Sequence, residues 1–90
     1  MRTVHKQTIQ VDQTRYEIQL PLDARVLHVA AQTADEFALS LWYDCDDGVF
    51  KTMRRFEFFG TGHPVPDGAG YVSTHVLIGG SLVLHLFEIA

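Results

Sequence analysis

Residues 81–88 read Ser-Leu-Val-Leu-His-Leu-Phe-Glu, an almost unbroken apolar run near the end of the chain. A short apolar run bounded by turn residues is typical of a buried strand, and this one predicts a central strand covered on both faces. Gly79 and Gly80 come directly before it and predict a tight hairpin to the preceding β-rich segment, residues 72–78. The end of the chain therefore indicates a β-sheet.

The same two-residue alternation recurs along the rest of the chain, and turn residues separate the segments that carry it. Residues 11–13 and 46–48 predict hairpins, the second because Asp-Gly tolerates positive φ. Residues 33–39 have the spacing of a helix cap, but the stretch is short and we expect a turn. About seven strands at this spacing predict an all-β fold, a single small antiparallel β-sandwich or partly open barrel spanning residues 1–90.

The composition limits the class of partner. The chain has 47% hydrophobic residues, and seven Lys and Arg stand against eleven Asp and Glu, a formal charge of −4. This balance disfavours binding to nucleic acid or to an anionic membrane, both of which need a basic face. Cys45 is the only cysteine and no segment reads as a signal peptide or a membrane span. We expect a cytoplasmic protein that forms a homo-oligomer, since small chains often gain stability and clefts in this way.

The densest turn signal is residues 59–70, which read Phe-Gly-Thr-Gly-His-Pro-Val-Pro-Asp-Gly-Ala-Gly. Glycines allow successive backbone N–H groups to surround an anion, a hydroxyl and an imidazole add donors, and prolines stiffen the loop. No helix is expected after the glycines, so this is neither a dinucleotide fingerprint nor a P-loop. The alternative is a purely structural connection. The loop residues predicted to bind a small anion are Gly60, Thr61, Gly62, His63 and Pro64.

Four residues outside the loop are further candidates. Arg54 and Arg55 point to opposite faces of a strand, so one of them is expected to neutralise a ligand's charge. Tyr71 is a candidate wall for stacking a base, and His85 lies in a strand expected to run near the loop. The alternatives are a solvated strand edge for the two arginines and core positions for Tyr71 and His85. No histidine spacing indicates a metal site, and Cys45 lies among acids that raise a thiol pKa, so we predict no metal, cofactor or catalytic residue.

Three segments together carry a family resemblance. Residues 60–66 contain the motif G-T-G-H-P-x-P, Tyr71 and Val72 follow it, and residues 80–88 contain G-x-L-V-x-H-x-F-E. These motifs resemble those of a family of small uncharacterised proteins encoded largely by bacteriophages and prophages. Ser73 departs from the family pattern, which usually has glycine there. The resemblance implies a phage origin and a compact β fold, and it implies no catalytic residue.

Small phage proteins of this kind often inhibit host processes. The leading hypothesis is therefore a non-enzymatic protein that sequesters a small anionic, nucleotide-like ligand that serves as a host immune signal. One alternative is a protein–protein interaction module that inhibits a host protein or serves as a minor virion component. A second alternative is a small phosphodiesterase-like enzyme that uses His63 and His85.

Overall fold

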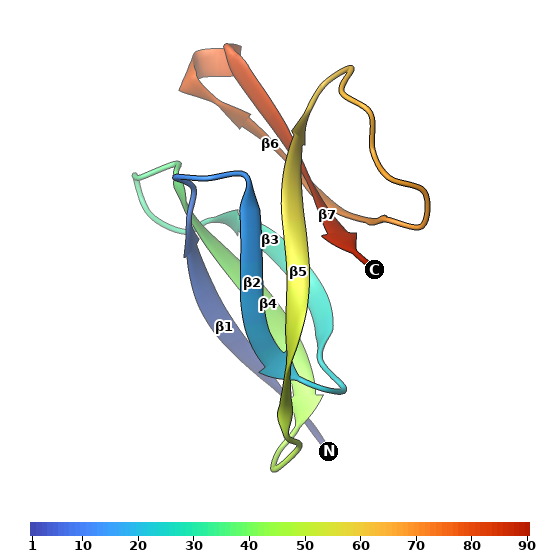
Figure 1. Ribbon diagram of the computed structural model, residues 1–90. Coiled ribbons are helices and arrows are strands. Elements are labelled where there is room, and N and C mark those ends of the chain that lie inside the picture. Colours follow the sequence, from blue (N-terminus) through green and yellow to red (C-terminus); the bar gives the residue numbers. More distant parts are fainter.

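The computed structural model, which describes residues 1–90, contains two antiparallel β-sheets that do not close into a barrel (Figure 1). The predicted all-β fold is confirmed, in its sandwich form. The strands are β1 (Arg2–Gln10), β2 (Arg15–Pro21), β3 (Arg25–Ala31), β4 (Ala38–Asp46), β5 (Lys51–Gly60), β6 (Gly70–Leu77) and β7 (Leu82–Ile89), with a single 3₁₀ turn, η1 (Ile78–Gly80), between the last two.

The strands of each sheet are not in chain order. The first sheet has the order β1-β4-β3 and the second the order β2-β5-β7-β6. The register between β1 and β4 is continuous over nine residues of each strand. The two edge strands β3 and β6 each carry an irregularity, between Val26 and His28 and between Tyr71 and Ser73. The two sheets have four edge strands in all, β1, β2, β3 and β6, and only β3 and β6 carry such an irregularity.

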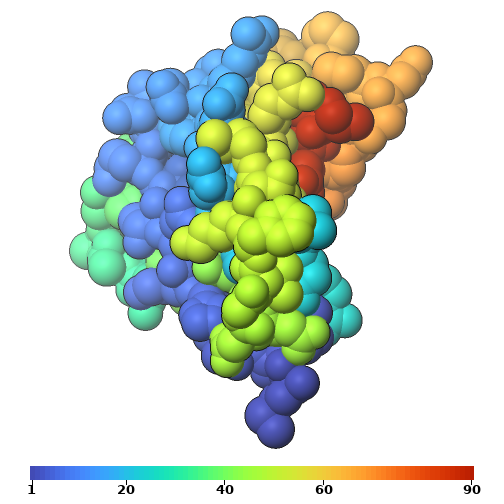
Figure 2. Space-filling view, turned by 60° about the horizontal axis from the view of Figure 1, so that its bottom comes forward, coloured from blue at the N-terminus to red at the C-terminus, as the bar shows by residue number.

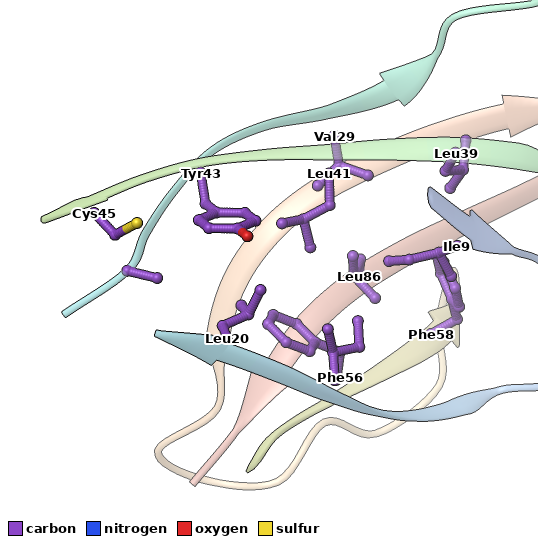
Figure 3. Packing of buried hydrophobic residues seen from close by; sticks show 12 residues of the cluster. Ile9, Leu20, Val29, Leu39, Leu41, Tyr43, Cys45, Phe56, Phe58 and Leu86 are labelled. Carbon is purple, nitrogen blue, oxygen red and sulfur yellow. The ribbon is translucent and has the colours of Figure 1, made fainter. Parts of the chain in front are cut away.

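The core lies between the inner faces of the two sheets (Figure 3). Side chains alternate across a strand, so every second residue of a half-buried strand faces the core. Leu41 from the first sheet and Leu20, Phe56 and Leu86 from the second are almost completely buried. The central cluster consists of Ile9, Ile18, Leu20, Ala24, Val29, Leu39, Leu41, Tyr43, Cys45, Phe56, Phe58 and Leu86.

Two of the predicted hairpins are wrong, because the chain changes sheet at both turns. β1 pairs with β4, and β2 pairs with β5, so residues 11–14 connect different sheets. Residues 47–50 likewise connect β4 to β5 across the sandwich. Gly48 does adopt a φ of +83°, as the Asp-Gly pair predicts. A turn signal specifies where the chain reverses, and the packing of the core decides whether the two strands then pair.

A tyrosine holds the first of these crossings in place. The hydroxyl of Tyr16 accepts hydrogen bonds from the backbone N–H groups of Asp12 and Gln13, each at 3.1 Å. It lies 2.9 Å from the carbonyl oxygen of Gln10, to which it donates. The side chain of Tyr16, near the start of β2, thus provides hydrogen-bond partners for backbone groups of the β1–β2 connection that have no partner in a neighbouring strand.

The structure of β6 and β7 confirms the predicted hairpin and contradicts the predicted burial of β7. Gly79 and Gly80 have φ of +58° and +93° and join β6 to β7 in the expected hairpin. β7 is internal to its sheet, but the prediction that both its faces are covered is wrong. Only Leu86 of this strand is buried, because a second sheet packs on the inner face alone. The turn expected over residues 33–39 is confirmed for residues 33–37, with the carboxylate of Asp35 accepting the N–H of Phe37, whereas Ala38 and Leu39 already belong to β4.

Candidate functional site

The glycine- and proline-rich loop exists because of the strand order. β5 and β6 each pair antiparallel with β7, so they run parallel to one another on either side of it. Antiparallel neighbours can be joined by a tight turn, whereas parallel strands need a connection that returns along the sheet. Residues 61–69 make that return, and Figure 1 shows them (orange) swinging away from the sheets between the end of β5 and the start of β6.

Two tight turns shape the loop. The N–H of His63 donates to the carbonyl of Gly60 at 3.1 Å, and Gly62 has a φ of +88°. A second turn begins at Pro66 and places Gly68 at a φ of +83°. Positive φ at the third residue is the geometry of a type II turn, which favours glycine there. Gly62 and Gly68 thus have a structural role.

Position 60 carries a residue without a side chain for a different reason. The imidazole of His63 packs over it, so that a Cβ on Gly60 would lie 3.0 Å from Cε1 of His63. The backbone N–H groups of Thr61 and Gly62 donate to no carbonyl within the chain. The turn therefore presents two free backbone donors and an exposed imidazole at one place on the surface.

Beside this turn, four side chains form a continuous hydrogen-bonded chain. Nε2 of His85 lies 2.8 Å from Oγ1 of Thr61, and Nδ1 of His85 lies 2.9 Å from Oγ1 of Thr74. Oγ1 of Thr74 lies 2.7 Å from the hydroxyl of Tyr71. A hydroxyl both donates and accepts, so this chain is satisfied with either tautomer of a neutral imidazole. The structure therefore brings together three of the predicted site residues, Thr61, Tyr71 and His85, through a fourth, Thr74.

Aromatic rings border this polar chain. The ring of Phe87 packs edge-on against Phe59 on one side and Tyr71 on the other, with centroids 5.7 and 5.6 Å away. Such edge-to-face contacts hold rings in defined orientations. Tyr71 is 61% exposed, so one of its faces remains open to solvent. The site thus combines hydroxyls, imidazoles and an available aromatic face.

The two candidate arginines lie far from the turn at residues 60–63. Arg54 and Arg55 point to opposite faces of β5, as predicted, and the loop begins about 20 Å further along at the usual rise of a strand. The far end of the loop returns toward Arg54, which lines one hollow together with Gly70 and Tyr71. Arg54 donates two hydrogen bonds, of 2.6 and 2.7 Å, to the carboxylate of Glu88, and this pairing raises the pKa of its guanidinium. Arg55 is exposed and donates to the carbonyl of Ala90 at 2.9 Å. Glu88 therefore already neutralises the charge of Arg54.

The match to a known family extends over every element described above. A family model described as "Domain of unknown function (DUF7352)" matches residues 1–90. The chain belongs to the DUF7352 family. No curated protein and no solved structure matches it.

Sequence reasoning missed Thr74, which links the two halves of the site in this DUF7352 domain. The hairpin predicted at Gly79 and Gly80 was sufficient to place Thr74 beside His85. Once Leu77 is paired with Leu82 across the Gly79-Gly80 turn, the antiparallel register places Thr74 opposite His85. It also missed Glu88 as the partner of Arg54, because these residues belong to non-adjacent segments of the chain.

The structure also shows the surroundings of the other groups in the DUF7352 domain that could carry chemistry. Cys45 is buried, and burial, followed by the charge of Asp23, raises the pKa of its thiol. No hydrogen bond joins His63 to His85, and both ring nitrogens of His85 are occupied by hydroxyls. No three His, Cys, Asp or Glu side chains are grouped in a way that would hold a metal ion. No helix of the structure is long and apolar enough to cross a membrane.

A separate hollow of about 600 Å³ lies over β2 and β5. Its lining places Arg15 and Arg55 beside Glu17 and Glu57. Opposite charges alternate here, so the hollow has no net preference for an anion. The turn at residues 60–63 and its hydrogen-bonded neighbours remain the better candidate site.

Proposed function

We propose that this DUF7352 protein is a phage-encoded, non-enzymatic binding protein. It captures a small anionic, nucleotide-like ligand, a host immune signal, in the cytoplasm of the infected cell. The observation that carries the proposal is the surface chain of Thr61, His85, Thr74 and Tyr71 beside the free N–H groups of the loop turn. The phage origin is what the sequence resemblance implies, and the class of signal is inferred from that origin.

Each part of a nucleotide has a matching group at this site. The free N–H groups of Thr61 and Gly62 suit the oxygens of a phosphate. With a neutral His85, one of the hydroxyls of Thr61 and Thr74 donates to the imidazole, and the other can donate to a phosphate or to a sugar. The exposed ring of Tyr71 offers a stacking face for a base. Arg54 has no part in this proposal, because Glu88 holds its guanidinium.

The same contacts favour binding over turnover. A catalytic histidine needs a free nitrogen directed at substrate and a partner that orients the other nitrogen. Both nitrogens of His85 bond to threonine hydroxyls, and neither of these hydroxyls is activated by a carboxylate. His63 has no side-chain partner to orient it. A ligand bound here would therefore be released unchanged.

The first test is native mass spectrometry of the protein after incubation with extract from phage-infected bacteria, followed by denaturation to release any bound molecule. The proposal predicts one discrete small molecule that is released intact. Its mass identifies the ligand class. A spectrum with no bound molecule would contradict the proposal, and a chemically altered nucleotide would instead support the phosphodiesterase alternative.

Variants then locate the site. Thr74→Val removes one hydroxyl with little change of shape, so the fold should persist and ligand uptake should fall. Thr3→Val is the matched control, because Thr3 is also an exposed strand threonine and makes no side-chain hydrogen bond. Equal uptake by both variants would show that the ligand binds elsewhere.

An apolar patch favours the second candidate function, an interaction module that inhibits a host protein or belongs to the virion. Phe50 and Leu22 are 70% and 55% exposed and lie side by side, since the N–H of Leu22 donates to the carbonyl of Phe50, and Met53, 47% exposed, follows along β5. In Figure 2 the segment around residue 50 (yellow-green) stands at the front, uncovered by other segments. Exposed apolar clusters mark protein contacts. Specific capture of one host protein, lost in Phe50→Ser, would support this function.

A further inference from the structure

The first strand leaves one side of its backbone unpaired. β1 pairs only with β4, so its other edge is an edge of the whole sheet. We propose that this edge pairs two copies of the chain. The two β1 strands run antiparallel across a two-fold axis and join their sheets into one continuous six-stranded sheet. This inference is independent of the proposed ligand.

The four sheet edges differ in how well they can accept another strand. Edge strands usually carry a feature that prevents such pairing, including prolines, bulges and short length. β2 has seven residues and ends at Pro21, while β3 and β6 are interrupted by irregularities at Leu27 and Val72. β1 has nine residues, no proline and an unbroken register with β4. It is the one edge with neither a proline nor an irregularity.

The pairing pattern identifies which backbone groups are free. The N–H of Val11 donates to the carbonyl of Phe37, which continues the β1–β4 register by one residue. In an antiparallel ladder the residues that bond to one neighbour alternate with those that face away from it. Odd-numbered residues of β1 therefore bond to β4. The free N–H and C=O groups belong to Arg2, Val4, Lys6 and Thr8. At Gln10 only the N–H is free, because its carbonyl accepts from the N–H of Asp12 and from the hydroxyl of Tyr16.

Charged side chains do not obstruct this edge. A lysine in the middle of an edge strand usually discourages pairing. Here Nζ of Lys6 donates to the side chain of Gln32 at 2.8 Å, which draws the ammonium over its own sheet. Arg2 is held in the same way by Asp44. Figure 1 shows β1 at the outer side of its sheet, with no strand along its free edge.

The sequence of β1 allows it to pair with itself without placing like charges opposite one another. If the two-fold axis passes beside Gln7, Lys6 lies opposite Thr8 of the second copy, and Val4 lies opposite Gln10. No like charges then face each other. The N–H and C=O groups of Lys6 and Thr8 bond in pairs, and the N–H of Gln10 donates to the carbonyl of Val4. An axis at Lys6 would instead place Lys6 directly opposite Lys6 of the second copy, and like-charged residues in that position are unfavourable. The proposed occupant is a second copy in the Gln7-centred register.

Sedimentation equilibrium of the full chain tests this proposal. The wild type should sediment as a reversible dimer. Thr8→Lys creates two Lys–Lys pairs across the axis and should weaken the dimer about tenfold, whereas Thr8→Glu creates two Lys–Glu pairs and should strengthen it by a similar factor. Gln19→Lys, an exposed site on the edge strand β2, is the matched control and should leave the dimer unchanged.

Two results would overturn the proposal. One is a wild-type protein that stays monomeric at the highest soluble concentration. The other is a dimer that responds equally to Thr8→Lys and Thr8→Glu, because the proposed register predicts opposite signs. Circular dichroism of each variant confirms that the folded state is retained, since Thr8 is exposed and its N–H does not bond to β4.

Discussion

His63 lays its imidazole ring on Gly60, so closely that a Cβ on Gly60 would lie 3.0 Å from the ring carbon Cε1. The contact means that the two glycines of the G-T-G-H motif are needed for different reasons. Gly60 leaves room for an exposed ring that can move, whereas Gly62 has a φ of +88° that a side chain disfavours.

This difference predicts unequal effects of two alanine substitutions. Gly62→Ala should lower the free energy of unfolding by about 1 kcal/mol, because alanine is strained at positive φ. Gly60→Ala should cost less than about 0.5 kcal/mol, because His63 can rotate away, and should change the NMR signals of that imidazole. Urea denaturation of both variants measures the difference. Equal losses of stability would show that His63 is held rigidly in place.

Asp44 makes the fold sensitive to acid. Its buried carboxylate accepts hydrogen bonds from Arg25 and Arg2, which hold its pKa well below the usual range. A depressed carboxyl pKa stabilises the folded state above the ordinary value of about 4, and this contribution is lost as the pH falls below it. We expect the melting temperature to fall on acidification below about pH 4. Asp44→Asn should lower the melting temperature at pH 7 and should reduce its further fall on acidification.

His75 should add a second pH dependence, in a milder range. Burial, with a smaller effect from His28, lowers the pKa of His75, whose Nε2 lies 2.8 Å from the hydroxyl of Ser73. The unfolded chain then takes up a proton first, so stability is lost as the pH falls below the ordinary value of about 6.5. Urea denaturation at pH 7.5 and 5.5 should show this loss. His75→Gln should reduce it, and His5→Gln, at a more exposed histidine, should not.

Ile78 occupies a backbone conformation that β-branched residues avoid. Its φ is +50°, and its N–H donates to the carboxylate of Glu36. Because the side chain is 54% exposed, replacement by asparagine loses little burial and relieves the strain. We expect Ile78→Asn to raise the free energy of unfolding by about 1 kcal/mol.

The matched control for this substitution is Val76→Asn. Val76 is 64% exposed and lies in the regular part of β6, so the same loss of an apolar side chain there relieves no strain. Val76→Asn should therefore not stabilise the protein. If both variants gained the same stability, removal of exposed apolar surface would be the cause.

The sequence correctly predicted the turn positions, and misjudged what some of them connect. Gly48 and Gly79 both adopt positive φ where their neighbours predict a turn. Only the turn at Gly79 joins paired strands, whereas the one at Gly48 carries the chain to the other sheet. Turn residues act on local dihedral angles, but pairing depends on which faces must be buried together.

The candidate site shows the same division. Residue types alone singled out Thr61, Tyr71 and His85, because hydroxyl, phenol and imidazole groups near a glycine turn suit ligand binding. Their assembly through Thr74 depends on the register of β6 with β7 and on the loop that returns from β5. Arg54 fitted the pattern equally well, but it pairs with Glu88, 34 residues away in sequence.

The sequence by itself determined that this chain forms β-strands, where those strands break, and which face of each strand is apolar. These properties follow from the two-residue period of side chains and from the local dihedral preferences of glycine and proline. Only the tertiary structure decided the order β2-β5-β7-β6 and, with it, the need for the long loop beside His85. The physical reason is that strand order minimises exposed apolar surface over the whole molecule, a quantity that no short segment contains.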